Sequence, residues 1–289
     1  MSDPAPLAGV RVIDASRMIP GAVLAQRLIH LGAEVVKVED PRGGDPLRAM
    51  PPARGGVGVG FAVWYAGAQS VALQLGREPG NAGLAALVAG ADVLVESFRS
   101  GTLDRWGLPL EGLRARHPRL VTVSLPSYPT ASASADEVAH DMNVLARSGL
   151  LARIGSDAAV PRVQLVDVTT GLLATEAVLA ALLRRARTER GGHIEQPLVS
   201  GALPHLSWAW ADHAAAGVVG ASERVIGGGC ASYALYRCGD GERLAVGCLE
   251  PKFWRTLCET LGVAELVHDG LRDDARGRAA HSRIESLLA

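Results

Sequence analysis

The stretch that decides the fold is VRVIDASRMIPGAVLAQRLIHLGAEVVKVE, residues 10–39. The β-branched run at Val10–Ile13 predicts a strand, and EVVKVE at residues 34–39 predicts a second one. Between them lies a helical stretch whose apolar side carries Leu24, Leu28 and Leu31. Gly32 follows as a natural C-terminal cap. Two strands joined by a helix form the basic parallel α/β unit.

The same pattern recurs further along the chain. Further strands are expected at 70–75, 92–96 and 120–125, and helices at 82–87 and 168–187. The strands are continuous apolar runs, which is typical of strands covered on both faces. In the longest helix one stripe contains Leu172, Glu176, Leu179 and Leu183. The sequence therefore predicts an α/β fold with a Rossmann-like parallel-sheet domain over residues 1–195.

The composition changes after this domain. Residues 196–228 are interpreted as a linker that ends in a glycine run, GGG at 227–229. Residues 233–249 predict a hairpin with Gly-Asp-Gly at its turn. A smaller α+β domain is expected over residues 229–289.

Composition also limits the partners. The 289 residues carry a net charge of -1, which gives no electrostatic drive for nucleic acid or anionic membranes. We expect no membrane span, because no apolar run approaches the required length, and we expect no signal peptide. The four cysteines have no metal-ligand spacing, so we expect reduced thiols, no metal site and a cytoplasmic location.

Three residues suggest a reaction. His140 lies in AHDMNVLARSGLL, Asp167 in LVDVTTGLLATE, and Glu250 ends a predicted strand in RLAVGCLEP. A histidine and a carboxylate that face one substrate carbon can remove a proton from one side and return one to the other. Each also has a plain structural interpretation: a hydrogen-bonded histidine, a helix N-cap at Asp167 and a solvated acid at Glu250.

Four segments together carry a family resemblance. They are LAGVRVIDAS from Leu7, GAEVVKVEDPRGGDPLR from Gly32, ADVLVESFRSGTLDRWGL from Ala91 and LLRRARTERGGHIE from Leu182. With these segments the chain resembles the family III CoA-transferases from about residue 7 to about residue 261. AHDMNVLARSGLL and GCLEPKFW are similar to the α-methylacyl-CoA racemase branch in particular.

The resemblance implies the fold of that family, C-terminally short, and an acyl-CoA racemase that inverts the α-carbon of a 2-methylacyl thioester through an enolate. It implies His140, Asp167 and Glu250 as the proton-transfer residues, with Glu250 bonded to His140. It also implies the CoA contacts Lys37, Arg99 and Arg105. No cofactor is expected beyond the CoA that is part of the substrate, and the expected partner is a second copy of the chain.

Other activities stay open. Asp167 would be the nucleophile in a CoA-transferase, and a repurposed member would act on a carrier-bound or free biosynthetic intermediate. A non-catalytic relative is the remaining alternative. The chain departs from the family at YAGAQS, residues 65–70, where basic side chains are absent, and at PSYP, residues 126–129, in place of a glycine-rich loop. It also ends at Ala289, ahead of the family's returning segment, which leaves a full interlock of two subunits open.

Overall fold

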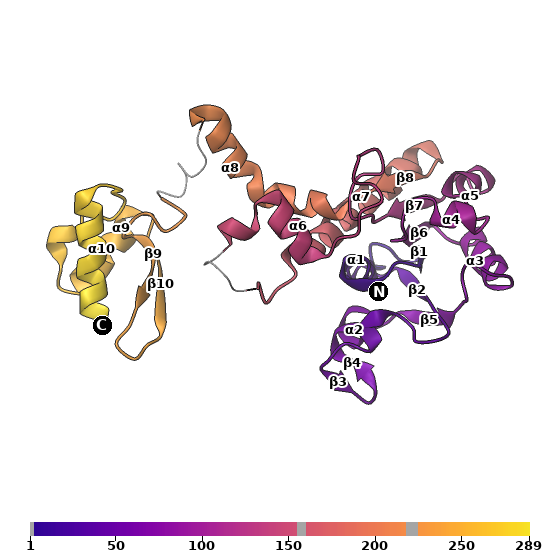
Figure 1. The fold of residues 1–289 in the computed structure, drawn as a ribbon, viewed down its shortest axis with the longest axis horizontal. Helices are drawn as coiled ribbons and strands as arrows, with labels where there is room; N and C mark the ends of the chain where they lie inside the picture. The colour runs from indigo at the N-terminus through magenta and orange to yellow at the C-terminus, as the bar shows by residue number, and fades with distance from the viewer. Residues whose placement is uncertain (1–2, 155–159, 218–224) are drawn as a thin grey trace. The chain divides into compact units, whose positions relative to one another are not determined.

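The computed structural model describes residues 3–154, 160–217 and 225–289. The chain divides into two compact units, Met1–Pro204 and His205–Ala289, which are described separately (Figure 1). The domain boundaries expected near residues 195 and 229 stay predictions.

A six-stranded parallel sheet forms the centre of the first unit. Its strands are β1 (Arg11–Asp14), β2 (Glu34–Glu39), β5 (Gln69–Ala72), β6 (Val93–Glu96), β7 (Val121–Ser124) and β8 (Gly192–Glu195). Their order is β5-β2-β1-β6-β7-β8, and every neighbouring pair is parallel. The predicted α/β fold with a parallel sheet is thus confirmed. The chain winds outward from β1 to β5 and then restarts at β6, so the direction of winding reverses between β1 and β6.

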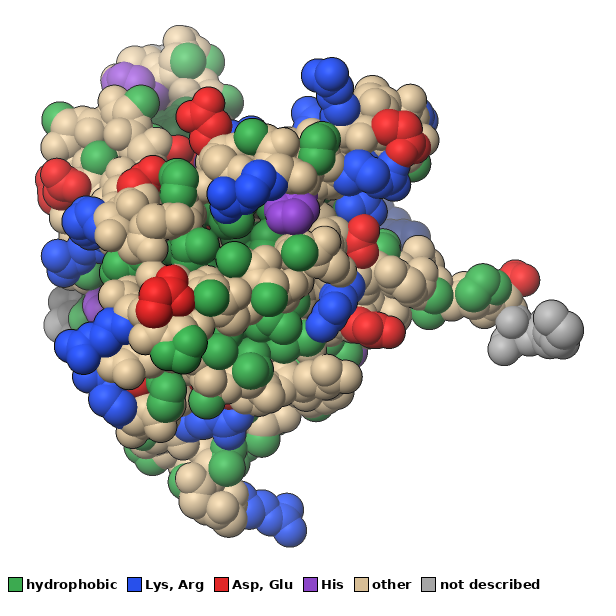
Figure 2. Space-filling model, turned by 90° about the vertical axis from the view of Figure 1, so that its right-hand side faces the viewer, with side chains coloured by type: hydrophobic (Ala, Val, Ile, Leu, Met, Phe, Trp, Pro, Cys, Tyr) green, Lys and Arg blue, Asp and Glu red, His purple; other side chains and the backbone are tan. Residues whose placement is uncertain are grey.

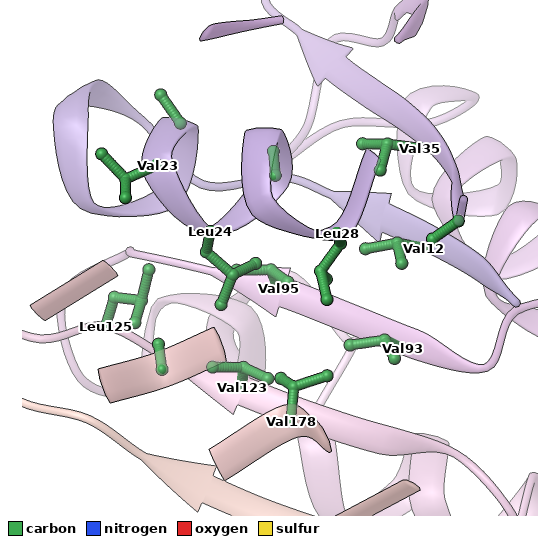
Figure 3. Close-up of a cluster of buried hydrophobic side chains, with 14 of the residues drawn as sticks. Val12, Val23, Leu24, Leu28, Val35, Val93, Val95, Val123, Leu125 and Val178 are labelled. Atoms are coloured by element: carbon green, nitrogen blue, oxygen red, sulfur yellow. The ribbon is translucent and has the colours of Figure 1, made fainter. Parts of the chain in front are cut away.

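Helices cover both faces of this sheet, as the apolar strands predicted. The helices of the first unit are α1 (Met18–His30), α2 (Val59–Trp64), α3 (Gly80–Ala89), α4 (Thr102–Arg105), α5 (Leu110–Arg116), α6 (Asp141–Ser148) and α7 (Leu165–Thr188). Residues of α1 and α7 share one core cluster with the sheet, and residues of α3, α4 and α5 share the other. Figure 3 shows Leu24 and Leu28 of α1 directed at Val93 and Val95, with Val178 of α7 beside them.

The contact between α1 and α7 depends on small side chains. A Cβ atom at Gly171 would lie 2.6 Å from the carbonyl oxygen of Pro20 and 2.7 Å from Cβ of Val23. The leucines of the stripe seen in the sequence lie on the other side of α7. Leu172, Leu179 and Leu183 are 45%, 36% and 57% exposed. The leucine stripe is therefore not the side of α7 that packs against α1. The packed side carries small residues such as Gly171, because only small side chains allow the two helices to approach this closely.

The α7 helix also corrects the expectation that no apolar segment reaches the length of a membrane span. By length and composition it could cross a membrane, and within the described residues it is the one helix of that kind. Its buried residues include Asp167 and Arg185, and Arg185 pairs with Asp92 at 2.8 Å. Together with its packing on α1, these contacts make α7 a core helix of the first unit.

The second unit is a small α+β assembly, which agrees with the predicted class. The hairpin of β9 (Tyr233–Arg237) and β10 (Arg243–Gly247) is antiparallel, and it precedes α9 (Pro251–Thr260) and α10 (Ala275–Leu288). Its core contains Tyr236, Trp254 and Ile284. The long α8 (Leu203–Ala216) begins at the end of the first unit.

The packing of α7 can be tested with one methyl group. Gly171→Ala should lower the free energy of unfolding by about 1–3 kcal/mol, because the backbone of α1 has to move away. Gly43→Ala is the matched control, since a Cβ at Gly43 meets nothing within 4 Å, and its change should stay within about 0.5 kcal/mol. Urea denaturation measures both. Equal losses in the two variants would contradict the close helix contact.

Candidate active site

A cavity of about 250 Å³ lies at the carboxyl edge of the parallel sheet. Arg17 and Met18 reach it from the end of β1, and Phe98 and Arg99 from the end of β6. It therefore occupies the point where the winding of the sheet reverses, the usual ligand position in open α/β sheets. Met18 has a φ of 66°, a left-handed conformation that costs roughly 1–2 kcal/mol in a non-glycine residue. Strain of this kind is concentrated at functional sites.

The two predicted proton-transfer residues of the first unit line this one cavity. His140 is the residue before α6 and is exposed, and its backbone N–H donates to Oδ1 of Asn143 at 3.0 Å. Asp167 lies in the first turn of α7 and is 7% exposed. The sequence brings them together across 27 positions because the N-termini of α6 and α7 meet.

Asp141 joins these two helix starts. Its Oδ1 accepts hydrogen bonds from the backbone N–H groups of Val166 at 2.7 Å and Asp167 at 3.0 Å. These groups belong to the first turn of α7, where helix N–H groups lack partners within the helix. Asp141, itself buried, therefore acts as the cap of α7 from a distant part of the chain.

This arrangement corrects the helix-cap interpretation of Asp167. The helix begins at Leu165, so Asp167 lies inside it, and the residue before the helix is Gln164, which makes no side-chain cap bond. The Asp167 side chain is free of a capping function and lines the cavity instead. No local sequence pattern around Asp141 indicates this partner 25 residues later.

Burial and a like charge set the acidity of Asp167. Removal from water disfavours the ionised carboxylate, and the neighbouring Asp141 charge disfavours it further, which together raise the pKa of Asp167 to about 7. At neutral pH this group is divided between its acid and its base form. A group of this kind can both accept and donate a proton.

Glu250 belongs to the second unit. It precedes α9, with Pro251 as the first helical residue, and makes no side-chain cap bond. Its predicted hydrogen bond to His140 stays a prediction, because the two residues lie in separately described units.

The predicted CoA contacts fall into different environments. Lys37 is 1% exposed, and its Nζ lies 3.4 Å from Asp14 and 3.2 Å from Asp45. This burial argues against a contact of Lys37 with CoA, since both carboxylates already neutralise it. Arg99 is exposed and lines the cavity. Arg105 is exposed, donates to Thr102 at 2.8 Å and does not line that cavity.

The structure shows where the two segments that depart from the family pattern, residues 65–70 and 126–129, lie. Tyr65 turns inward, and its hydroxyl donates to Asp14 at 2.9 Å. Residues 66–69 line none of the described cavities. In the second segment Tyr128 lies under the guanidinium of Arg147, 4.7 Å from its ring centroid, and Arg147 pairs with Glu137. Pro126 and Ser127 line the cavity, so this segment forms part of its wall together with Glu137.

Comparison with known proteins agrees with this architecture. The family model described as CoA-transferase family III matches residues 7–289. The chain belongs to CoA-transferase family III. Its fold resembles the crystal structure of a CaiB/BaiF family protein from Brucella suis, with a TM-score of 0.83 and 28% identity over 99% of this chain and 78% of that one.

Curated relatives have two kinds of activity. A probable fatty acyl-CoA transferase of Mycobacterium tuberculosis is 31% identical over 96% of this family III chain and 74% of its own length. The α-methylacyl-CoA racemase of Mus musculus is 31% identical over 89% of this chain and 65% of its own length. The chain thus spans about two thirds to three quarters of these relatives. Racemases and CoA-transferases are matched equally well, so the family is enzymatic without one activity being singled out.

The acidity of Asp167 gives a stability test. Its folded pKa of about 7 lies above the ordinary 3.8, so the folded state binds more protons between these pH values. The free energy of unfolding should therefore fall as pH rises from about 4 to about 7. Asp167→Asn removes this loss, and above pH 8 the variant should be more stable than the parent by on the order of 4 kcal/mol. At pH 4 the two should be nearly equal.

Urea denaturation at pH 4, 6 and 8.5 measures this difference. Asp141→Ala is the contrasting variant, because it removes the cap of α7 and should lower stability by about 1 kcal/mol. A loss of stability in Asp167→Asn at pH 8.5 would instead indicate that the Asp167 side chain caps α7.

Proposed function

We propose that this chain is a racemase that inverts the α-carbon of a 2-methylacyl thioester by two-base proton transfer. The observation that carries the proposal is one cavity lined by both His140 and Asp167, with the Asp167 pKa near neutrality. Transfer is efficient when the pKa of the group lies close to the working pH. One residue takes the α-proton, the thioester becomes an enolate, and the other residue returns a proton to the opposite face.

The supporting residues follow from the same geometry. Asp141 holds the two segments together and raises the pKa of Asp167, so it is a positioning residue. The N–H groups of Val166 and Asp167 donate to Asp141, so they are not available as donors to the enolate oxygen. Arg99, at the edge of the cavity, is the proposed contact for an anionic part of the thioester carrier. Glu250, the residue before α9, is the third proposed proton-transfer residue.

A CoA-transferase is the second candidate. It is favoured by the transferase relative of the same identity and by the buried carboxylate of Asp167, which would attack a thioester and form an acyl anhydride. The ionised fraction of Asp167 at neutral pH would be the nucleophile. In this activity His140 would have no obligatory part.

Deuterium exchange separates the two activities. In D₂O the parent should incorporate deuterium at the α-position of both epimers of a 2-methylacyl-CoA. His140→Ala should lose exchange from one epimer and Asp167→Asn from the other, each by roughly 10²- to 10⁴-fold. His30→Ala, at the exposed end of α1, is the matched histidine control and should exchange at the parent rate. Mass spectrometry of the recovered ester gives the rates.

Two results would contradict the racemase. One is full exchange in both His140→Ala and Asp167→Asn. The other is no exchange in the parent together with CoA transfer between acids and hydroxylamine trapping at Asp167, which would establish the transferase.

We also propose that two copies of the chain associate through α7. The exposed Leu172, Leu179 and Leu183 lie on one side of this helix, and a contiguous exposed apolar stripe of this kind is typical of an interface. The four free cysteines support a reducing, cytoplasmic location.

The association can be measured by sedimentation. Leu183→Asp should shift the parent dimer toward monomer by at least 10-fold in dissociation constant, because a charge would be buried in the interface. Ala86→Asp, at an exposed position of α3, is the control on a helix outside the proposed interface. A parent that sediments as a monomer would exclude the proposal.

A further inference from the structure

A second cavity, of about 150 Å³, adjoins the first at the ends of β1 and β2. Arg17 and Phe98 line both cavities. The second cavity also has aromatic and aliphatic walls, where a nucleotide base could be expected. Its walls include three carboxylate residues, Glu39, Asp40 and Asp45.

Two basic residues around this second cavity, Arg42 and Arg48, are held in ion pairs, whereas Arg17 lines both cavities and forms no ion pair with a described residue. Arg42 donates to Asp40 through Nε at 3.0 Å and Nη2 at 2.7 Å, and this pairing lowers the pKa of Asp40. Arg48 forms two bonds with Glu39, at 2.6 and 2.7 Å, and the pKa of Glu39 is lowered to about 2 by its hydrogen bonds and by this charge, against the effect of burial. Two-point pairs of this kind are among the stronger charged interactions.

Lys37 is neutralised in the same way. It lies between Asp14 and Asp45 and 4.9 Å from the ring centroid of Tyr65. Beyond Arg17, which it shares with the first cavity, the second cavity would therefore offer a phosphate group only carboxylates and cations that are already paired with one another. If the phosphate drew one of these cations away, it would leave a buried carboxylate without a partner, which is costly in free energy.

The aromatic rings at this cavity are engaged as well. Phe98 and Trp106 pack edge to face, with ring centroids 5.0 Å apart. The second cavity is also the smallest of the three described at this edge of the sheet.

The remaining cations are Arg17, which lines both cavities, and Arg99, which lines the first. Neither forms an ion pair with a described residue, although the charge of Arg17 also contributes to the lowered pKa of Asp40. Arg17 lies over Phe98, 5.9 Å from its ring centroid, and Arg99 is the next residue after Phe98. Together they can hold one anionic group close to the cavity that contains Asp167.

We propose that the site recognises its thioester through the phosphopantetheine arm and makes no charged contact with the 3′-phosphate of CoA. Arg17 and Arg99 bind the single phosphate at the end of the pantetheine, and the nucleotide half is dispensable. The arm has two biological sources, acyl-CoA and an acyl chain on a carrier protein. This inference rests on the proposed function for the identity of the bound thioester, and its binding test is independent of turnover.

Calorimetric titration of the full chain tests the recognition. The ligands are CoA, 3′-dephospho-CoA, 4′-phosphopantetheine and pantetheine. The first three should bind with dissociation constants within about threefold of one another, and pantetheine should bind at least 10-fold more weakly. Binding of CoA more than 10-fold tighter than dephospho-CoA or phosphopantetheine, or no binding of phosphopantetheine, would overturn the inference.

Two arginine variants place the contact. Arg99→Gln should weaken CoA and phosphopantetheine by the same factor, roughly 10-fold, and leave pantetheine unchanged. Arg42→Gln, whose guanidinium is already held by Asp40, should leave all four affinities unchanged. A selective loss of CoA affinity in Arg42→Gln would show that the second cavity does hold the nucleotide.

The exchange assay then separates this inference from the proposed function. The 2-methylacyl esters of CoA and phosphopantetheine, and the same acyl group on a carrier protein, are compared for deuterium incorporation. Similar kcat/KM for the two small esters supports the inference, and a higher value for the carrier-bound chain identifies the carrier as the source. Exchange with the CoA ester at more than 10 times the rate for phosphopantetheine would overturn it while the racemase stands. Equal binding with no exchange in any ester would refute the racemase alone.

Discussion

The hydrogen bonds from the first turn of α7 to Asp141 are the constraint on which the candidate site depends. One carboxylate accepts both N–H groups, and it thereby fixes the residue before it, His140, next to a helix that starts 25 positions later. The same negative charge disfavours a second one nearby, so it also contributes to the raised pKa of Asp167. Position and acidity are therefore coupled, and a neutral residue at position 141 would change both at once.

The parallel sheet determines where this pair lies. Because all six strands run in the same direction, the segments that follow β1, β6 and β7 emerge at one edge. The reversal of winding between β1 and β6 separates the segments after these strands and leaves room for a cavity. Lys37, Arg42 and Arg48 near this edge are held in ion pairs, and the face of the protein in Figure 2 carries both acidic and basic side chains. Within the described part of the chain, Arg17 and Arg99 at the first cavity form no such ion pair.

Much of the fold could be predicted from local sequence. The strand at 34–39 was predicted with the bounds it has, because an apolar run between a helix cap and a turn has few alternatives. The buried side of α7 could not be predicted, since periodicity identifies a stripe without showing which neighbour covers it. In this protein Gly171 determines which side of α7 is buried, because it allows that side to pack closely against α1. The capping partner of α7 was also hidden, because Asp141 is distant in sequence and no local pattern marks such a bond.

The cavity has a further consequence for how the protein is made. Its walls are contributed by residues from Arg17 to Leu198, and the central β1 must pair with β6, some 80 positions later. Contacts this distant in sequence form slowly and cannot form before synthesis has supplied both partners. On the ribosome the N-terminal β1–β2 unit would emerge long before its neighbours, with one edge of the central strand open. Nascent chains of this protein should therefore depend on protection by chaperones until the sheet is closed on both sides.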